Sequence, residues 1–132
     1  MKNLLVDTSA WIEYFKARES VMNIIHDARN FRVLTAGPIV SELLLGFRTE
    51  REMKRFAACF QALPILDVDK DIWAESGMVG NALKRKGMTV PMADLILHCV
   101  AHRHGCAILT FDSHFRQMNE LLASDLEIIT PI

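Results

Sequence analysis

Four acidic residues that are far apart in the chain lie beside or within apolar segments: Asp7, Glu42, Asp94 and Asp112. Carboxylates brought together without cationic partners repel one another and raise one another's pKa. Carboxylate oxygens are hard ligands that suit Mg²⁺ or Mn²⁺, whereas Zn²⁺ prefers Cys and His. Ions held in this way activate water and stabilise a leaving oxygen, so the acids predict metal-dependent hydrolysis of phosphodiesters.

Short apolar segments alternate along the chain with longer segments of helical periodicity. Strands are expected at residues 4–6, 32–35, 64–68, 107–110 and 126–129. Helices are expected at 11–15, 20–28, 38–47, 56–60, 69–86 and 91–104, with a short one before the last strand. Strands separated by helices form parallel sheets covered on both faces. We therefore predict one three-layer α/β/α domain, residues 1–132, with a central parallel sheet of four to five strands.

The four acids fall where such a sheet binds ligands, which is beyond the carboxyl ends of its strands. Asp7 directly follows the first strand, and Asp112 lies two residues beyond the fourth. Glu42 and Asp94 lie four and three residues after a proline, in the first turns of two apolar helices. If those helices begin at the same edge of the sheet, the four carboxylates converge.

Glu42 lies within the very apolar segment 39–45, which predicts a mostly buried helix. Burying an unpaired polar group costs on the order of 2–7 kcal/mol, which a divalent cation would offset. Each acid also has a simpler interpretation. Asp7 could cap a helix, Asp94 could favour the positive end of a helix, Asp112 could be an N-cap, and Glu42 could form a buried salt bridge.

Composition restricts the class of protein. Hydrophobic residues make up 51% of the chain and charged residues 23%, so a packed core is expected and disorder is not. No apolar run approaches the roughly 20 residues of a membrane span, and the N-terminus becomes acidic too early for a secretory signal. The three cysteines are an odd number without paired spacing, which favours reduced thiols in the cytoplasm. With the four site acids set apart, twelve acids remain against fifteen Lys and Arg, a balance compatible with phosphate binding.

Four segments resemble, in order and spacing, the successive motifs of PIN-domain nucleases: VDTSAWI (6–12), SEL (41–43), ADLI (93–96) and LTFDSHF (109–115). The chain length and the start of the chain are similar to those of VapC-like toxins of bacterial toxin–antitoxin pairs. The resemblance extends over essentially the whole chain.

The resemblance implies an endoribonuclease that depends on Mg²⁺, with Mn²⁺ as a substitute. Asp7, Glu42 and Asp94 would be metal ligands, and Asp112 would complete the acidic pocket directly or through a water. The hydroxyl group of Thr110, and that of either Thr8 or Ser9, would hydrogen-bond the acids or a metal-bound water. The implied partners are an RNA substrate, a cognate antitoxin and a second copy of the chain. No association with a membrane is expected.

Many PIN domains carry a further acid at the position of His114, although some relatives also have His there. Occupancy of a second metal site is therefore left open, and one metal in the resting state is a reasonable hypothesis. The main rival interpretation is a catalytically silent PIN fold that binds RNA or protein. A haloacid-dehalogenase phosphatase needs a second Asp where Ser9 stands, and a phosphoacceptor receiver needs an acidic pair where Thr8 follows Asp7.

Three further features have both a functional and a structural interpretation. Lys84, Arg85 and Lys86, and a second basic group within 48–55, could hold RNA phosphates, although cations also favour helix C-termini. His98 lies one helical turn after Asp94 and could position it, although most such histidines are structural. The aromatic residues of segment 11–15 could form core or a groove for a partner helix.

Overall fold

The computed structural model describes residues 1–132 as a five-stranded sheet with seven helices. The strands are β1 (Lys2–Val6), β2 (Phe31–Ala36), β3 (Ile65–Leu66), β4 (Ala107–Leu109) and β5 (Ile128–Ile129). The helices are α1 (Thr8–Phe15), α2 (Glu19–Ile25), α3 (Gly37–Gly46), α4 (Glu50–Phe60), α5 (Lys70–Arg85), α6 (Met92–His104) and α7 (His114–Leu122).

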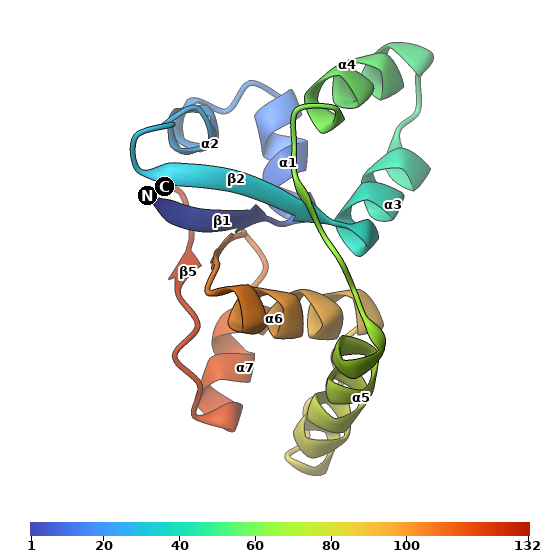
Figure 1. The fold of residues 1–132 in the computed structure, drawn as a ribbon, viewed down its shortest axis with the longest axis vertical. Coiled ribbons are helices and arrows are strands. Elements are labelled where there is room, and N and C mark those ends of the chain that lie inside the picture. The colour runs from blue at the N-terminus through green and yellow to red at the C-terminus, as the bar shows by residue number, and fades with distance from the viewer.

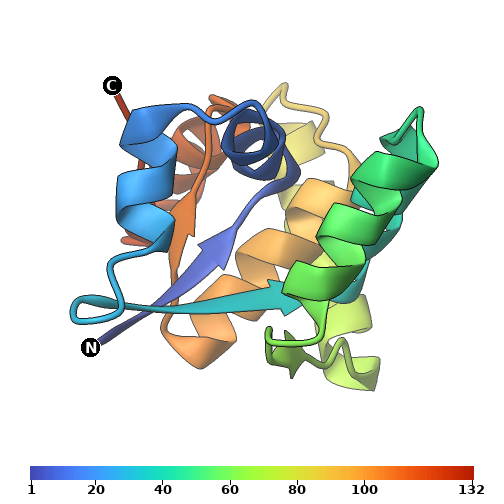
Figure 2. The same ribbon diagram turned by 90° about the horizontal axis from the view of Figure 1, so that it is seen from above.

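All neighbouring strands run parallel, in the order β3-β2-β1-β4-β5. Figures 1 and 2 show α1 and α2 on one side of the sheet and α6 and α7 on the other, with β1 in the middle. The predicted α/β/α fold with a parallel sheet is confirmed, and its strand number is five. The edge strands β3 and β5 are shorter than the segments 64–68 and 126–129 predicted for them.

Burial explains why the central strands form where they do. Leu4, Leu5 and Val6 of β1 have no exposed surface, and every residue of β4 is buried. Strands covered on both faces are expected to be continuously apolar, which both segments are. Because β1 and β4 are adjacent, with Val6 opposite Leu109, the residues that follow them meet at one edge of the sheet.

Local capping sets several helix ends. The Thr49 hydroxyl accepts a hydrogen bond from the Glu52 backbone N–H at 3.2 Å, which starts α4 within the polar stretch that was expected only to precede a helix. Asp69 caps α5 in the same way, through the N–H of Ile72 at 2.9 Å. Gly105, with a φ of +62°, ends α6 in the left-handed conformation.

The pairing of α5 with α6 positions the first turn of α6, which carries Asp94. A Cβ atom built on Gly80 of α5 would lie 2.7 Å from Cδ1 of Leu95, the residue after Asp94, so the missing side chain lets the helices approach closely. Arg103 near the end of α6 bonds Asp69 and Glu75 of α5 at 3.1 and 3.2 Å. None of the helices is both long and apolar enough to cross a bilayer.

Candidate metal centre

Asp7 marks the edge of the sheet at which the candidate centre lies. It follows β1 directly, and its backbone N–H donates to the Leu109 carbonyl of β4 at 3.0 Å, which extends the pairing of the two strands. The residue is only 5% exposed. A carboxylate this buried requires hydrogen-bond donors or a cation to offset the loss of hydration.

Two hydroxyl groups hold one oxygen of that carboxylate. The Ser9 and Thr110 hydroxyls donate to Oδ2 of Asp7 at 3.0 and 2.8 Å. Each hydroxyl oxygen also accepts a backbone N–H, from Phe111 at 3.0 Å and from Asp112 at 2.9 Å, respectively. Asp7 Oδ2 is therefore fixed, while Oδ1 accepts no hydrogen bond from the protein and is free to bind a ligand.

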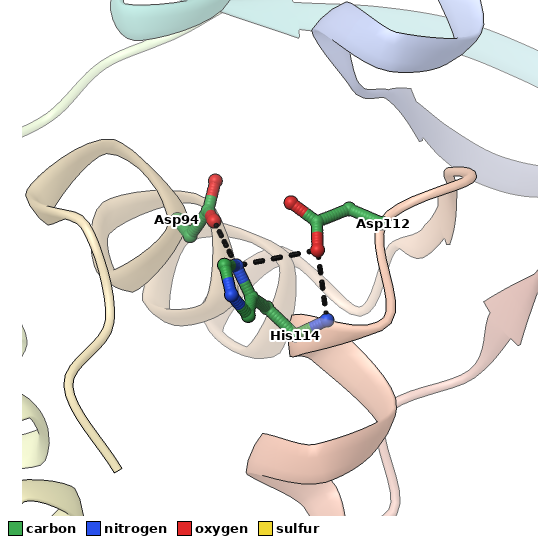
Figure 3. Close-up of side chains that lie close together, drawn as sticks. All are labelled: Asp94, Asp112 and His114. Atoms are coloured by element: carbon green, nitrogen blue, oxygen red, sulfur yellow. Dashed lines mark hydrogen bonds and ion pairs between the residues drawn. The ribbon is translucent and has the colours of Figure 1, made fainter.

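Asp94, Asp112 and His114 form a second part of the centre (Figure 3). His114 Nδ1 lies 3.1 Å from Oδ2 of Asp94 and 3.2 Å from Oδ1 of Asp112. The backbone N–H of His114 also donates to Oδ1 of Asp112 at 2.9 Å, so Asp112 caps the start of α7 as well. One potential ligand atom of each residue lies within 4.8 Å of the other two.

The pKa values of two of the acids, Asp94 and Glu42, are raised by their surroundings. Burial raises the pKa of Asp94, the charges of Asp7 and Asp112 raise it further, and the hydrogen bond from His114 opposes this. Desolvation also raises the pKa of Glu42, and the charges of Asp7 and Asp94 add to that shift. None of the four acids forms a salt bridge with a lysine or arginine. Asp94 and Asp112 therefore lie around His114 with ligand atoms within 4.8 Å of one another, and Asp7 and Glu42 lie close enough for charge to act between the acids without belonging to that group of ligand atoms.

The expectation that Glu42 is buried is wrong. Only Ile39 and Leu43 of α3 are buried, while Glu42 is exposed and Leu45 is 89% exposed. Although α3 is rich in apolar residues, most of its side chains do not pack into the core of the chain. Composition alone does not show this. Glu42 lies at the exposed side of the centre, close enough for the negative charges of Asp7 and Asp94 to add to the rise in its pKa.

His98 and Thr8 occupy different surroundings from those expected. His98 is 5% exposed and makes no hydrogen bond to Asp94, whose imidazole partner is His114. Burial lowers the pKa of His98, the charge of His102 lowers it further, and the charge of Glu75 opposes this. The Nδ1 atom of His98 is buried without a hydrogen-bond partner. The Thr8 hydroxyl is buried without a hydrogen-bond partner, whereas Ser9 bonds Asp7.

The basic residues at the end of α5 are exposed: Lys84, Arg85 and Lys86. Lys86 Nζ donates to the Leu121 carbonyl of α7 at 2.6 Å, so at least this cation also has a structural contact. The predicted contact of these residues with RNA stays a prediction.

A pocket of about 580 Å³ adjoins the centre between α1, α3 and α4, with Glu42 as part of its lining. Three of its lining residues carry positive charge and form no salt bridge: Lys16, Arg48 and Arg55. Phe15 and Phe47 supply aromatic surface. The sequence drew attention to the segments 11–15 and 48–55, but not to Lys16, which only the turn after α1 brings beside them.

Comparisons with known proteins agree with this geometry. The PIN domain family matches residues 4–121. A VapC ribonuclease of Mycobacterium bovis and Ribonuclease VapC11 of Mycobacterium tuberculosis are each 32% identical to the chain over 119 residues, which covers 85% of this chain and 88% of each relative.

Solved structures resemble the whole fold. The VapBC2 structure from Rickettsia felis, bound to a DNA fragment from its promoter, superimposes with a TM-score of 0.82 at 17% identity, covering 97% of this chain and 98% of that one. Because the family match spans nearly the entire chain and curated relatives exceed 30% identity, this chain belongs to the PIN-domain family, in which its homologues are VapC ribonucleases.

Proposed function

We propose that the chain is a divalent-metal-dependent endoribonuclease that acts as the toxin of a toxin–antitoxin pair. The observation that carries the proposal is the set of four carboxylates at one edge of the sheet, Asp7, Glu42, Asp94 and Asp112, none paired with a lysine or arginine. The relatives named as ribonucleases support the reaction class.

The donor set fits a hard divalent cation. Asp7 offers Oδ1 because its other oxygen is held by Ser9 and Thr110. Burial first, and the charges of neighbouring acids second, raise the pKa of Glu42 and of Asp94, and a cation would offset both penalties on the ionised carboxylates. When bound, such an ion lowers the pKa of a water molecule and stabilises negative charge on a phosphodiester. Mg²⁺ prefers an oxygen-rich set of this kind, and Mn²⁺ can replace it.

The protein's own contribution is to fix the carboxylates before any ligand arrives. The hydrogen-bonded chain from Asp112 N–H through Thr110 to Asp7 connects the acids that follow β4 and β1. This arrangement holds the nearly buried Asp7 side chain in place, because the two hydroxyl donors replace part of its lost hydration. Preorganised charge of this kind needs little rearrangement during the reaction.

The pocket beside Glu42 supports RNA as the substrate. Its volume of about 580 Å³ falls in the range of small-molecule sites, so it could take one nucleotide of a bound strand. Lys16 and Arg48 could contact phosphates, and Phe47 offers aromatic surface against which a base could stack. Arg55 and Phe15 already contact each other, with the guanidinium 5.4 Å from the centre of the ring. Lys84–Lys86 remain a second candidate phosphate contact.

A cognate antitoxin and a second copy of the chain are the proposed protein partners, in the cytoplasm. The toxin–antitoxin complexes among the structural neighbours support the first. Exposed apolar side chains support protein contacts in general, since Leu45 is 89% and Trp73 54% exposed. The competing function is a silent PIN fold that binds RNA or protein without cutting it.

The test is cleavage of a labelled pool of single-stranded RNAs with Mn²⁺, by the parent chain, Asp7→Asn and Asp94→Asn. We expect both variants to lose at least about 100-fold in rate, because removing even the partners of metal ligands costs 10–100-fold. Asp125→Asn, at an exposed acid outside the centre, should cut at the parental rate. Equal cutting by all four proteins would refute the site, and RNA binding without cutting by the parent would favour the silent module.

A further inference from the structure

We propose that His114 is itself a metal ligand, through Nδ1, and that this nitrogen makes the centre prefer Mn²⁺ to Mg²⁺. The inference rests on the proposed function only in requiring that the acids bind a divalent cation. It differs from the expectation of a Mg²⁺ centre in which Mn²⁺ is a substitute.

The spacing of the donor atoms carries the proposal. In an octahedral complex with bonds of about 2.1 Å, adjacent ligand atoms lie about 3.0 Å apart, which is the bond length multiplied by √2. His114 Nδ1 lies 3.1 Å from Asp94 Oδ2 and 3.2 Å from Asp112 Oδ1. These distances match two edges of such a complex, so Nδ1 is already spaced as a neighbouring ligand of each of the two oxygens.

The orientation of the imidazole supports the same conclusion. Figure 3 shows the His114 ring directed toward both carboxylates, and its Nδ1 is the nitrogen that faces them. Nε2 makes no hydrogen bond to the protein, and the side chain is 35% exposed. Ligating histidines keep a proton on the nitrogen away from the metal and donate it to water or protein. A proton on Nε2 would leave the Nδ1 lone pair available to the ion.

The backbone holds this arrangement in place. His114 begins α7, and its N–H donates to the same Asp112 oxygen that lies near its ring. Asp94 lies in the first turn of α6, which packs against α5 where Gly80 meets Leu95. The three donors therefore come from ordered helix starts, which makes coordination by the ring possible without moving a loop.

The same distances fit a second arrangement, in which a protonated His114 is the counter-ion of the two carboxylates. The two cases differ in what a metal would bind. As a counter-ion, His114 would be displaced when the metal enters and would contribute no nitrogen to it. As a ligand, it would stay, and a nitrogen atom would be bonded directly to the metal.

Ligand chemistry links the nitrogen to metal choice. Mg²⁺ prefers oxygen and retains its waters, whereas imidazole nitrogen binds the first-row transition ions better. A centre made of carboxylates and His114 should lose Mg²⁺ affinity relative to Mn²⁺. An acid at position 114 would restore an all-oxygen set, so His114→Asp should shift the preference toward Mg²⁺.

The test uses the purified full chain, loaded with Mn²⁺ alone and studied by pulsed electron paramagnetic resonance and calorimetry. We expect the wild-type complex to show electron-spin-echo modulation from a directly bound nitrogen, with the pattern changed when the chain carries nitrogen-15 histidine. His114→Asp should lose the modulation, while His104→Asn, at an exposed histidine on α6, should keep it. The ratio of Mg²⁺ to Mn²⁺ dissociation constants should fall at least about tenfold in His114→Asp.

Two results would overturn the inference: Mn²⁺ bound tightly by the wild type without nitrogen modulation, or modulation that persists in His114→Asp. Either result leaves the proposed nuclease intact, since the ion is still bound. If neither the wild type nor His114→Asp binds Mn²⁺, the proposed function fails as well. The labelled wild-type chain needs no substitution, so the answer does not depend on whether a variant folds.

Discussion

Replacing Asp94 by Asn should make the metal-free protein more stable while removing its response to metal. The Asp94 side chain is 13% exposed, and burial together with the charges of Asp7 and Asp112 raises its pKa. Two like charges 4.8 Å apart, the outer limit for the Asp94 and Asp112 ligand atoms, repel by about 3 kcal/mol at an effective dielectric constant of about 20. The hydrogen bond with His114 offsets part of this, so we expect Asp94→Asn to raise the free energy of unfolding by about 1–2 kcal/mol in EDTA at pH 8.

Metal should reverse the order of the two proteins. An ion at a hundred times its dissociation constant stabilises the wild type by about 2.7 kcal/mol. At about 2.1 cal/mol/K per residue, a chain of 132 residues has an unfolding entropy of about 0.28 kcal/mol/K, so its melting temperature should rise by about 10 °C. Asp94→Asn should show almost none of this rise.

The pH dependence has a definite sign. A carboxyl group whose pKa is raised in the folded state destabilises the fold when ionised, and this penalty disappears below the pKa of the unfolded chain. The advantage of Asp94→Asn in EDTA should therefore be greatest at pH 8 and shrink as the pH falls through the raised pKa of Asp94. Groups that lie away from Asp94 cancel in the difference between the two proteins, whereas Glu42, whose pKa the Asp94 charge raises, contributes with the same sign.

Differential scanning calorimetry in EDTA and in MnCl₂ measures both effects, with Asp125→Asn as the control. The control removes an exposed acid that forms no salt bridge, and it should melt within about 1 °C of the wild type while keeping its metal response. If Asp94→Asn melts below the wild type in EDTA and still gains the full shift with Mn²⁺, neither the repulsion nor the metal assignment stands.

Three further predictions concern other parts of the molecule. The pKa of buried His98 is lowered in the fold, so stability should be lost as the pH falls below about 6.5, by up to about 1.4 kcal/mol per pH unit, and urea titrations of His98→Gln should show a flatter profile. Gly77→Ala should raise the unfolding free energy by about 0.5–1 kcal/mol, because no atom lies within 4 Å of the new Cβ. In the same thermal melts, Gly80→Ala should raise the unfolding free energy by less than Gly77→Ala does, or lower it, because the side chain of Leu95 must move to make room for the new Cβ. Arg48→Gln should reduce the salt dependence of RNA binding, measured by fluorescence anisotropy, by about 0.7 in the logarithmic slope, and an unchanged slope would exclude a phosphate contact there.

The sequence was sufficient to predict the sheet edge on which the acids lie. Asp7 and Asp112 each follow a continuously apolar segment, and the carboxyl ends of parallel strands meet at one edge. That rule does not require knowledge of strand order. The hydrogen bonds from Ser9 and Thr110 to Asp7 do require it, because they exist only where β1 and β4 are neighbours.

Predictions from helical periodicity were less reliable where they depended on which way a side chain faces. One turn separates His98 from Asp94, yet His98 makes no hydrogen bond to it, and His114, from another helix, meets the acid. Segment 39–45 has apolar residues on several sides, but the chain buries only the side that carries Ile39 and Leu43. Composition alone therefore predicted the wrong environment for Glu42. The environment of Glu42 and the choice between the two interpretations of His98 both depend on packing between helices, which a local pattern does not specify.

His114 connects the stability of the metal-free protein with its choice of metal. Its hydrogen bond lowers the pKa of Asp94, which opposes the rise caused by burial and by the neighbouring acids. An aspartate at position 114 would replace that hydrogen bond with another negative charge, so His114→Asp should melt at a lower temperature than the wild type in EDTA. The same substitution should improve binding of Mg²⁺, which prefers oxygen ligands. If His114→Asp instead melts higher without metal, the imidazole does not relieve the repulsion among these acids, and a different role for it would be required.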